Sequence, residues 1–283
     1  MPAITIKAFH VIFLLLVLTA SPSRAAIIAK WDFDQGDLTD SSGNGHHLMH
    51  FNQFYPLSYG QGRNGLAPIF TNADYLYSRA PELHANRAEF TVGGWIRSSQ
   101  TQGRDSILFM NGDDHTGFVR FYGGATLHYD TIYGYVRSGT NNVSSSGAGI
   151  DVNDGNWHHI ALVKAASTEL NLRLYFDGEL IKEKTLGPGS TGPGNIFTIG
   201  GKAYGDRTAA GLGFTGLIDE VFVADHAMTI DEIRHVAGIT AVPEPSPFGL
   251  LLIAGGLLGC FLRRPIRRSR GKRLRRIPRR SSR

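Results

Sequence analysis

Short stretches of the chain alternate apolar and polar residues with a period of two, which predicts strands with one buried face. Trp31 and Phe33 alternate with aspartates, and in residues 170–176 every second residue is apolar. Asp177 and Gly178 directly follow this second stretch, and the pair favours a type I′ turn because both positions take positive φ angles. We therefore expect a tight β hairpin at this point.

One segment near residue 230 has the spacing of a helix instead. Thr229 is a suitable N-cap, and Glu232 three positions later completes a capping box. Ile230 and Ile233 share a face, and Gly238 provides a C-terminal stop. We expect a short helix that packs at the edge of the fold.

Many short strands with a single late helix favour an all-β fold, because a parallel α/β fold would need repeated crossover helices. The 35 glycines and the many aromatic residues agree with a turn-rich β protein, and the single Cys260 excludes an internal disulfide. No internal repeat is present. We expect residues 27–240 to form one antiparallel sandwich of two sheets.

The first 26 residues have the order of a secretory signal peptide. Lys7 precedes an apolar run over residues 8–20, and small residues follow at Ser23 and Ala25. This order predicts a signal peptide that is cleaved after Ala25 or Ala26. The alternative, an uncleaved anchor helix, would need about 20 apolar residues.

The end of the chain has three parts. Pro243, Glu244 and Pro245 form a short motif, residues 248–262 are apolar or small, and residues 263–283 hold 12 Lys and Arg and no acid. At about 1.5 Å per residue the apolar run spans roughly 23 Å of a hydrocarbon core that is ~30 Å thick. We expect a single transmembrane helix whose basic tail stays in the cytoplasm.

This order of motif, apolar run and arginine cluster resembles the PEP-CTERM sorting signal, here over residues 241–283. The resemblance implies a Gram-negative bacterium in which an exosortase recognises the motif and processes the tail. The protein would be exported across the inner membrane, anchored through residues 248–262, and then released to the cell envelope or the outside. Such proteins usually accompany exopolysaccharide production. The alternative is a simple stop-transfer anchor beside anionic lipid.

The formal net charge of +5 hides two regions of opposite sign. The basic tail contrasts with residues 27–262, which contain 15 basic and 24 acidic residues and carry a charge of −9. An acidic body repels phosphate backbones, so we expect no nucleic acid among the partners.

Five segments of the body stand in the order seen in concanavalin A-like lectin/glucanase domains of the laminin-G-like group. They are WDFDQGDLTDSSGNGHHL, EFTVGGWIRS, DGNWHHIALVK, LRLYFDGELI and FTGLIDEVFVADHAMTIDEIRHVA. The resemblance implies a jelly-roll sandwich, often with a structural or ligand-bridging Ca²⁺. It also implies a role in binding carbohydrate or other extracellular partners.

The sequence offers no pattern for hydrolysis of sugars. Glycosidases on this kind of sandwich resemble one another in an E-x-D-x-E strand, which places two carboxylates on one face, and no such run is present. Asp219 and Glu220 are adjacent, so a regular strand would point them to opposite faces. We expect them to accept loop hydrogen bonds or to bind a cation, and we expect no enzyme.

Two groups of histidines suggest a metal, but neither has a complete ligand set. His46, His47 and His50 lie close together in the sequence, and His158 and His159 are adjacent on an expected strand. The adjacent pair would face opposite sides, and no Cys or closely spaced Glu completes a zinc site. We expect the pair to belong to the framework and the other three to lie in a solvated loop.

Ca²⁺ is the expected cofactor. The loop that starts at Asp40 and includes Asn44 offers side-chain and carbonyl oxygens, the hard ligands that Ca²⁺ takes. Asp32, Asp34 and Asp219 would complete the set if the first and last strands pair. The alternative is that Asp40 and Asn44 make the side-chain-to-backbone bonds of an ordinary turn.

A sugar site needs an aromatic platform and a few convergent polar groups. One stretch supplies such residues in abundance: Tyr122, Tyr129, Asp130, Tyr133, Tyr135 and Arg137. These are our candidates for carbohydrate binding. The alternative for each tyrosine is a cross-strand pair that stabilises the sheet.

The sequence therefore predicts an exported, non-catalytic, lectin-like protein of the cell envelope or exopolysaccharide matrix. Its expected partner is a polysaccharide or an extracellular protein, besides the exosortase. An adhesive matrix scaffold that binds proteins is the first alternative, and a divergent glycoside hydrolase is the second.

Overall fold

The computed structural model describes residues 26–51, 56–71, 74–83, 87–102, 106–111, 121–128, 131–137, 142–144, 148, 150–185, 196–201, 203–204, 207–208 and 213–240. The chain divides into two units, Met1–Thr240 and Ala241–Arg283, and all described residues belong to the first. Residues 1–25 and the three sorting segments lie outside the described part. Within that part, no helix has the length and apolar character that a membrane crossing requires.

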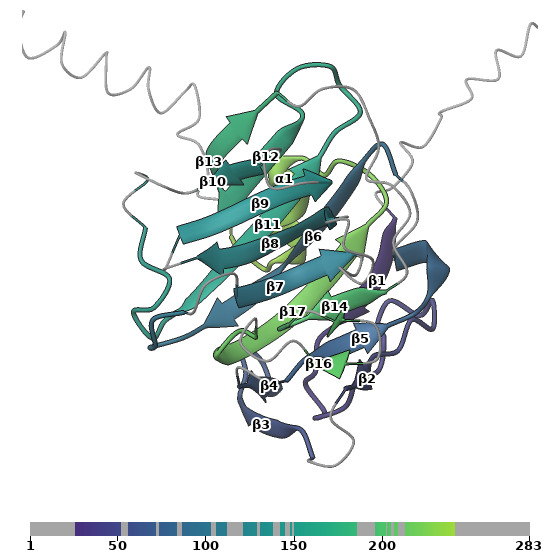
Figure 1. Ribbon diagram of the computed structural model, residues 1–283, viewed down its shortest axis with the longest axis vertical. Helices are drawn as coiled ribbons and strands as arrows, with labels where there is room; N and C mark the ends of the chain where they lie inside the picture. The colour runs from purple at the N-terminus through teal and green to yellow at the C-terminus, as the bar shows by residue number, and fades with distance from the viewer. Residues whose placement is uncertain are drawn as a thin grey trace, which may run out of the picture. The chain divides into compact units, whose positions relative to one another are not determined.

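The body is an all-β sandwich of two antiparallel sheets (Figure 1). The larger sheet has eight strands, seven of them in a continuous path and β1 (Ile27–Trp31) paired to β17. The path is β13 (Glu179–Lys184), β12 (Leu172–Phe176), β11 (Trp157–Lys164), β6 (Phe90–Arg97), β17 (Gly216–Ala224), β4 (Leu66–Phe70) and β3 (Ser58–Gln61).

The smaller sheet has seven strands. They are β10 (Asn142–Ser144), β9 (Thr131–Arg137), β8 (Phe121–His128), β7 (Ser106–Asn111), β14 (Phe197–Ile199), β5 (Leu76–Ser78) and β2 (Met49–His50). A separate ribbon pairs β15 (Ala203–Tyr204) with β16 (Arg207–Thr208). The helical elements are the 3₁₀ turn η1 (Pro81–Leu83) and the helix α1 (Ile230–Val236). This architecture agrees with the predicted jelly roll.

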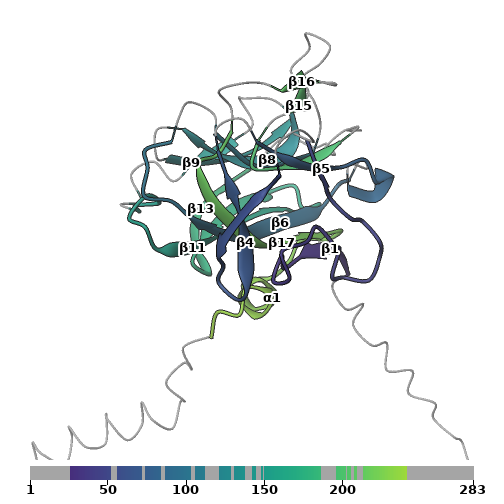
Figure 2. The ribbon, with the colours of Figure 1, turned by 90° about the horizontal axis from the view of Figure 1, so that it is seen from below.

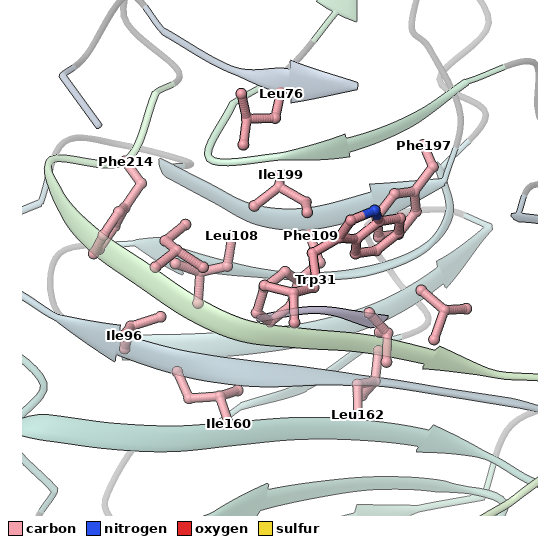
Figure 3. Packing of buried hydrophobic residues seen from close by; sticks show 14 of the residues in the cluster. Trp31, Leu76, Ile96, Leu108, Phe109, Ile160, Leu162, Phe197, Ile199 and Phe214 are labelled. Carbon is pink, nitrogen blue, oxygen red and sulfur yellow. The ribbon is translucent and has the colours of Figure 1, made fainter. Parts of the chain in front are cut away.

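The main core lies between the two sheets, because alternate residues of each strand point inward. Trp31 stacks on Phe197 of the opposite sheet with ring centroids 5.5 Å apart. Figure 3 shows these two rings among aliphatic side chains from both layers, including Ile96, Leu76 and Ile199. One apolar cluster thus joins the sheets.

The predicted hairpin is confirmed. β12 and β13 pair on either side of Asp177 and Gly178, whose φ angles are 49° and 77°. The expected strand begins later than the pattern suggested, however. Leu170 has a φ of 44° and is 44% exposed, so it belongs to the preceding turn and not to the buried face.

The predicted helix and its capping box are also confirmed. The Thr229 side chain accepts a bond from the Glu232 backbone N–H, and the Glu232 carboxylate accepts from the Thr229 N–H. Its location differs from the expectation: α1 lies on the outer face of the larger sheet rather than at an edge (Figure 2). Ile233 is buried there against Val163 and Phe222, which form a second apolar layer.

The first strand pairs with the last, as the calcium hypothesis required. β1 runs antiparallel to β17, with Trp31 opposite Val221. The chain turns immediately afterwards, since Phe33 has a φ of 53° yet remains buried. This turn brings Asp34 close to the middle of β17.

Candidate functional site

A cavity of about 390 Å³ opens on the outer face of the larger sheet. Arg97 of β6 and Leu217 of β17 are partners in the strand register, and both line this cavity. Their neighbours Ile96 and Ile218 lie in the core, so Arg97 and Leu217 face outward. Ile69 of β4 pairs with Leu217 and adds a second aliphatic group to the lining.

One wall of the cavity is fixed by a buried amide. Gln102 is 2% exposed, and its Nε2 donates to Ser98 Oγ at 2.8 Å and to the carbonyls of Gln100 and Thr215 at 2.9 Å. The Thr215 N–H in turn donates to Gln102 Oε1 at 3.0 Å. The loop after β6 is thereby held against the start of β17.

Arg97 holds a second wall. Its Nε donates to the Gly155 carbonyl at 3.0 Å, and the Gly155 N–H donates to the Ser98 carbonyl at 2.8 Å. These bonds attach the loop before β11 to the end of β6. Arg97 is the one charged residue among the described residues that line the cavity. Within the described part, no carboxylate forms an ion pair with it and nothing accepts a bond from its terminal nitrogens.

Next to the cavity, on the same face, an aromatic and cationic layer covers the sheet. The Arg63 guanidinium lies 3.9 Å from the centre of the Trp95 ring, and Trp95 Nε1 donates to the Ala237 carbonyl at 3.2 Å. His159 is fully buried between Trp95 and Phe222. Burial, and secondarily the charge of Arg63, lowers the pKa of His159 to about 3. His159 is therefore a neutral packing residue, as predicted for the framework.

His158 faces the side of β11 opposite to His159, as predicted for two adjacent residues on a strand. Its Nδ1 lies 2.8 Å from Asp177 Oδ2, its Nε2 lies 3.1 Å from Asp154 Oδ1, and its ring stacks on Phe176. Burial alone would lower the pKa of His158, but hydrogen bonds and charge from Asp177 and Asp154 outweigh it and raise the pKa. Both ring nitrogens are engaged, so His158 has no nitrogen left for a metal.

The adjacent acids of β17 do not follow the pattern of a regular strand. The register shifts between Asp219 and Phe222, and Glu220 has a φ of 48°. This β-bulge turns both carboxylates toward one loop: the Arg63 N–H donates to Asp219 Oδ2 at 2.7 Å, and Asn64 Nδ2 donates to Glu220 Oε1 at 3.0 Å. The expectation of opposite faces was wrong, whereas the expected loop hydrogen bonds are confirmed.

Asp34 joins this pair in an acidic cluster. Burial raises the pKa of Asp219 to about 7, and the charges of Glu220 and Asp34 contribute to the rise. Burial and the charge of Glu220 raise the pKa of Asp34, whose buried Oδ1 has no hydrogen-bond partner. Lys30 Nζ lies 2.6 Å from Glu220 Oε2 and balances one of the three charges.

The Asp40 loop makes side-chain-to-backbone bonds both within its own turn and to the first strand. Asp40 Oδ1 accepts from the N–H groups of Lys30 and Ser42, and Oδ2 accepts from that of His46, at 2.9–3.0 Å. Burial alone would raise the pKa of Asp40, but these donors lower it. Asn44 donates its side-chain amide to two backbone carbonyls of β1. The loop oxygens that the calcium hypothesis assigned are thus largely engaged.

The calcium candidates therefore fall into two groups. In the first group, the charge of Asp34 helps to raise the pKa of Asp219, and the charge of Asp32 helps to raise that of Asp34. In the second group, Asp40 and Asn44 form hydrogen bonds with β1. In the described ranges, no three His, Cys, Asp or Glu side chains are placed to share a metal ion.

The loop histidines do not converge either. His47 Nδ1 accepts from the Asp40 N–H at 3.1 Å, and His50 Nε2 lies 3.5 Å from Asp74. The His46 carbonyl accepts from Trp31 Nε1 at 2.9 Å, so this loop closes over the first strand. The loop prediction thus fits His46 and His47, whereas it was wrong for His50, which is on the short strand β2 with its side chain largely buried.

The tyrosine-rich stretch maps to two neighbouring strands of the smaller sheet. Tyr122 is on β8, and Tyr133, Tyr135 and Arg137 are on β9, but their side chains lie outside the described part of the structure. Residues 129–130, with Tyr129 and Asp130, lie outside it altogether. A sugar site on these residues stays a prediction.

The fold places this chain in a known class of proteins, the two-sheet antiparallel β sandwiches. Residues 70–234 match the family model Laminin_G_3, described as the concanavalin A-like lectin/glucanases superfamily. The match extends over more than half of the 283 residues, and the chain therefore belongs to this superfamily. The predicted resemblance to concanavalin A-like lectin/glucanase domains is confirmed. No curated protein sequence gives a significant match.

Solved structures with the same fold are distant in sequence. Domain 4 of AbnA, an extracellular arabinanase of family GH43 from Geobacillus stearothermophilus, has a TM-score of 0.57 at 20% identity, over 75% of this chain and 98% of that one. The binding domain of Paraclostridial Mosquitocidal Protein 1 has a TM-score of 0.58 at 14% identity, over 74% and 51%. The binding domain of botulinum neurotoxin serotype G has 0.54 at 13%, over 75% and 50%. This chain thus spans about half the length of the two toxin domains.

Proposed function

We propose that this chain is an exported, non-catalytic carbohydrate-binding module, and that the cavity beside Arg97 is its binding site. The observation that supports this proposal is the combination of side chains and hydrogen bonds that form the cavity. Aliphatic side chains of Ile69 and Leu217 line it, polar groups surround it, and the hydrogen bonds of Gln102 and Arg97 fix two of its walls. Small-ligand sites combine apolar surface with a few fixed polar groups in this way, and fixed walls lower the cost of binding.

The relatives support sugar as the first ligand class to test. The structure of the arabinanase domain is a complex with arabinotriose, and the matched region covers 98% of that domain. The ligand-binding domain of botulinum neurotoxin serotype D, with a TM-score of 0.53 and 11% identity, is in complex with N-acetylneuraminic acid. These ligands belong to those proteins, and here they support a saccharide as the ligand class.

The interactions of the two acidic residues on β17 also support a role without catalysis. Asp219 and Glu220 each accept a bond from the loop that follows β3, and Lys30 pairs with Glu220. A glycosidase needs one carboxyl group as acid and another as nucleophile or base, both facing the substrate. These two carboxylates instead connect a bulge to a loop.

Export and sorting form part of the proposal. The signal peptide at residues 1–26 and the PEP-CTERM-like segment at 241–283 would deliver the sandwich to the cell envelope or exopolysaccharide matrix through an exosortase. Mass analysis of the working form in its producing cells tests this directly. We expect residues before 26 and residues after the motif at 243–245 to be absent. An intact tail on all of the protein would favour the simple membrane anchor.

We also propose that Ca²⁺ binds between Asp34 and Asp219, with backbone oxygens and water as further ligands. The support is the buried, unpaired Oδ1 of Asp34 and the excess negative charge around Asp219. At about 100 times its dissociation constant, Ca²⁺ should add roughly 2.7 kcal/mol to the unfolding free energy. Thermal unfolding in Ca²⁺ and in chelator should therefore differ for the native protein and for Asp151→Asn, but not for Asp34→Asn. Equal melting of the native protein in both buffers overturns this site.

The binding function is tested on a glycan array that includes the producing organism's exopolysaccharide. Ser99 lines the cavity and is exposed, so Ser99→Trp should fill the cavity without affecting the fold. Ser167→Trp places the same side chain on an exposed loop and serves as the control. We expect retention by the native protein and the control, and at least a tenfold loss in Ser99→Trp. Retention of no glycan would overturn the proposal, and self-association at sedimentation equilibrium would then favour the scaffold alternative.

A further inference from the structure

We infer that the cavity beside Arg97 selects saccharides that carry a carboxylate, such as a uronic acid residue on an otherwise neutral chain. This inference rests on the proposed carbohydrate function and adds the chemical class of the ligand. It concerns the outer face of the larger sheet, which the tyrosine-based prediction did not include.

The first argument is the state of the Arg97 guanidinium. Its Nε donates to the Gly155 carbonyl, which fixes the orientation of the planar group. The edge that carries the two terminal nitrogens is then left without a partner among the described residues, at the wall of a cavity. The two terminal nitrogens of a guanidinium can bind a carboxylate through two parallel hydrogen bonds.

The second argument is that the rest of the lining suits a sugar. Gln61, Gln100 and Thr215 offer amide and hydroxyl groups that exchange hydrogen bonds with sugar hydroxyls. Ile69 is 36% exposed although it is aliphatic, and with Leu217 it provides an apolar surface for the C–H face of a pyranose ring. The cavity volume of about 390 Å³ lies in the range of roughly 300–1,000 Å³ that is usual for small-ligand sites.

The third argument limits how much charge the ligand carries. Residues 27–262 have a formal charge of −9, and Arg97 is the one charged residue described in the cavity lining. A densely charged polyanion would be repelled by the body as it approaches. A single carboxylate in contact with Arg97 is affected less, because charges further away than about 8 Å are screened at physiological salt. The ligand that fits is therefore sparsely acidic.

The test compares oligosaccharides in matched pairs. Each acidic oligosaccharide on the array is accompanied by its carboxyl-reduced, neutral counterpart, and affinities are measured for the full sandwich. We expect at least one acidic member to bind, with its reduced counterpart at least ten times weaker. Binding to neutral members alone, or equal binding within every pair, overturns the inference and leaves the carbohydrate function standing. Binding to no member overturns both.

Variants at Arg97 then assign the preference to this residue. Arg97→Gln should lower binding of the acidic member to the level of its reduced counterpart, whereas Lys182→Gln, which removes an exposed charge on β13, should have no effect. Arg97→Lys keeps the charge but loses the paired hydrogen bonds, so we expect a preference reduced several-fold. If Arg97→Gln does not fold, Arg97→Lys decides. An unchanged preference in whichever variant is folded overturns the inference.

Discussion

Gln102 is buried where the loop after β6 meets the start of β17, and both ends of its side-chain amide are hydrogen-bonded. A nonpolar residue of similar size would leave the Thr215 N–H and two carbonyls without these partners. A fully buried group that loses its partner costs about 1–3 kcal/mol, but Gln100 is exposed and Thr215 partly exposed, so water replaces some of the lost bonds. We therefore predict that Gln102→Leu lowers the unfolding free energy by about 2–4 kcal/mol, measured by urea unfolding.

A nearby glutamine provides the control for this prediction. The side chain of Gln100 is exposed, so Gln100→Leu should stay within about 0.5 kcal/mol of the native protein. Equal losses in the two variants would mean that the amide of Gln102 does not hold the wall of the cavity.

His158 gives the fold a dependence on pH. Its pKa in the folded state is raised above the unfolded value by Asp177 and Asp154, after the opposing effect of burial. The protonated imidazole therefore stabilises the fold fully below about pH 6.5, and this stability is lost as pH rises through the folded pKa. We predict that the difference in unfolding free energy between native protein and His158→Gln shrinks as pH rises above about 6.5.

Taking the difference between the native protein and His158→Gln removes the contribution of other titrating groups such as Asp219. A second variant changes the partner of His158. Asp177→Asn keeps a residue that tolerates the positive φ of the turn but removes one of the two charges beside His158. It should show a smaller pH dependence than the native protein over the same range. A His158→Gln variant whose unfolding free energy runs parallel to that of the native protein at all pH values would contradict the prediction.

At the scale of the elements, the hairpin between β12 and β13 depends on the conformation and the small size of one glycine. Gly178 has a φ of 77°, and an added Cβ would lie 3.0 Å from Arg234 Cγ and 3.2 Å from Ile239 Cδ1. An alanine is strained at this φ by roughly 1–2 kcal/mol, and crowding against the residues around α1 adds to that. We predict that Gly178→Ala lowers the unfolding free energy by about 2 kcal/mol or more.

The control separates strain from crowding. Gly43 has a similar φ of 87°, but an added Cβ would meet nothing within 4 Å. Gly43→Ala should therefore show the conformational cost alone, and chemical denaturation of both variants measures the difference. A larger loss in Gly43→Ala than in Gly178→Ala would contradict the proposed contact between hairpin and helix.

The same elements show what a sequence reveals about structure. The Asp177 and Gly178 turn and the Thr229 capping box were predictable because their signals lie within a few residues of one another. The bulge at Glu220 was not, because its partner is a loop more than 150 residues earlier in the chain, contacted through Asn64. Leu170 fitted the strand period yet takes a positive φ, because the chain is still in the turn that precedes β12.

The candidate site was less predictable than the fold. The lining of the cavity comes from strands and loops that are distant in the sequence, including Gly60, Arg97, Gly155 and Leu217. Their adjacency follows from the order of strands in the larger sheet, which periodicity does not determine. The one local signal was a charged residue at the end of a buried strand, in the alternation Trp95, Ile96, Arg97. Conversely, the Asp40 loop had the composition of a cation site, but the Asp40 carboxylate binds backbone N–H groups of its own turn and of β1.

At the scale of the whole molecule, the core makes the two sheets interdependent. The main apolar cluster contains residues of both layers, and Gly94 of the larger sheet closely approaches Phe109 of the smaller one. Neither sheet has another partner for its inner face within the described part of the chain. The sandwich should therefore unfold as one cooperative unit.

The distribution of tryptophans makes this cooperativity measurable. The chain has 3 tryptophans, and Trp31, Trp95 and Trp157 all lie on strands of the larger sheet, so their fluorescence reports on that sheet and, through Trp31, on its contact with Phe197. Leu76 is fully buried on β5 of the smaller sheet, and Leu76→Ala should cost about 2–5 kcal/mol through lost burial and a cavity. Because the sheets share one core, we predict that this change shifts the urea midpoint of tryptophan fluorescence as much as that of far-UV circular dichroism. Leu180→Ala, at an exposed position of β13, should shift neither. A fluorescence midpoint that stays in place while the dichroism midpoint falls would show that the layers unfold separately.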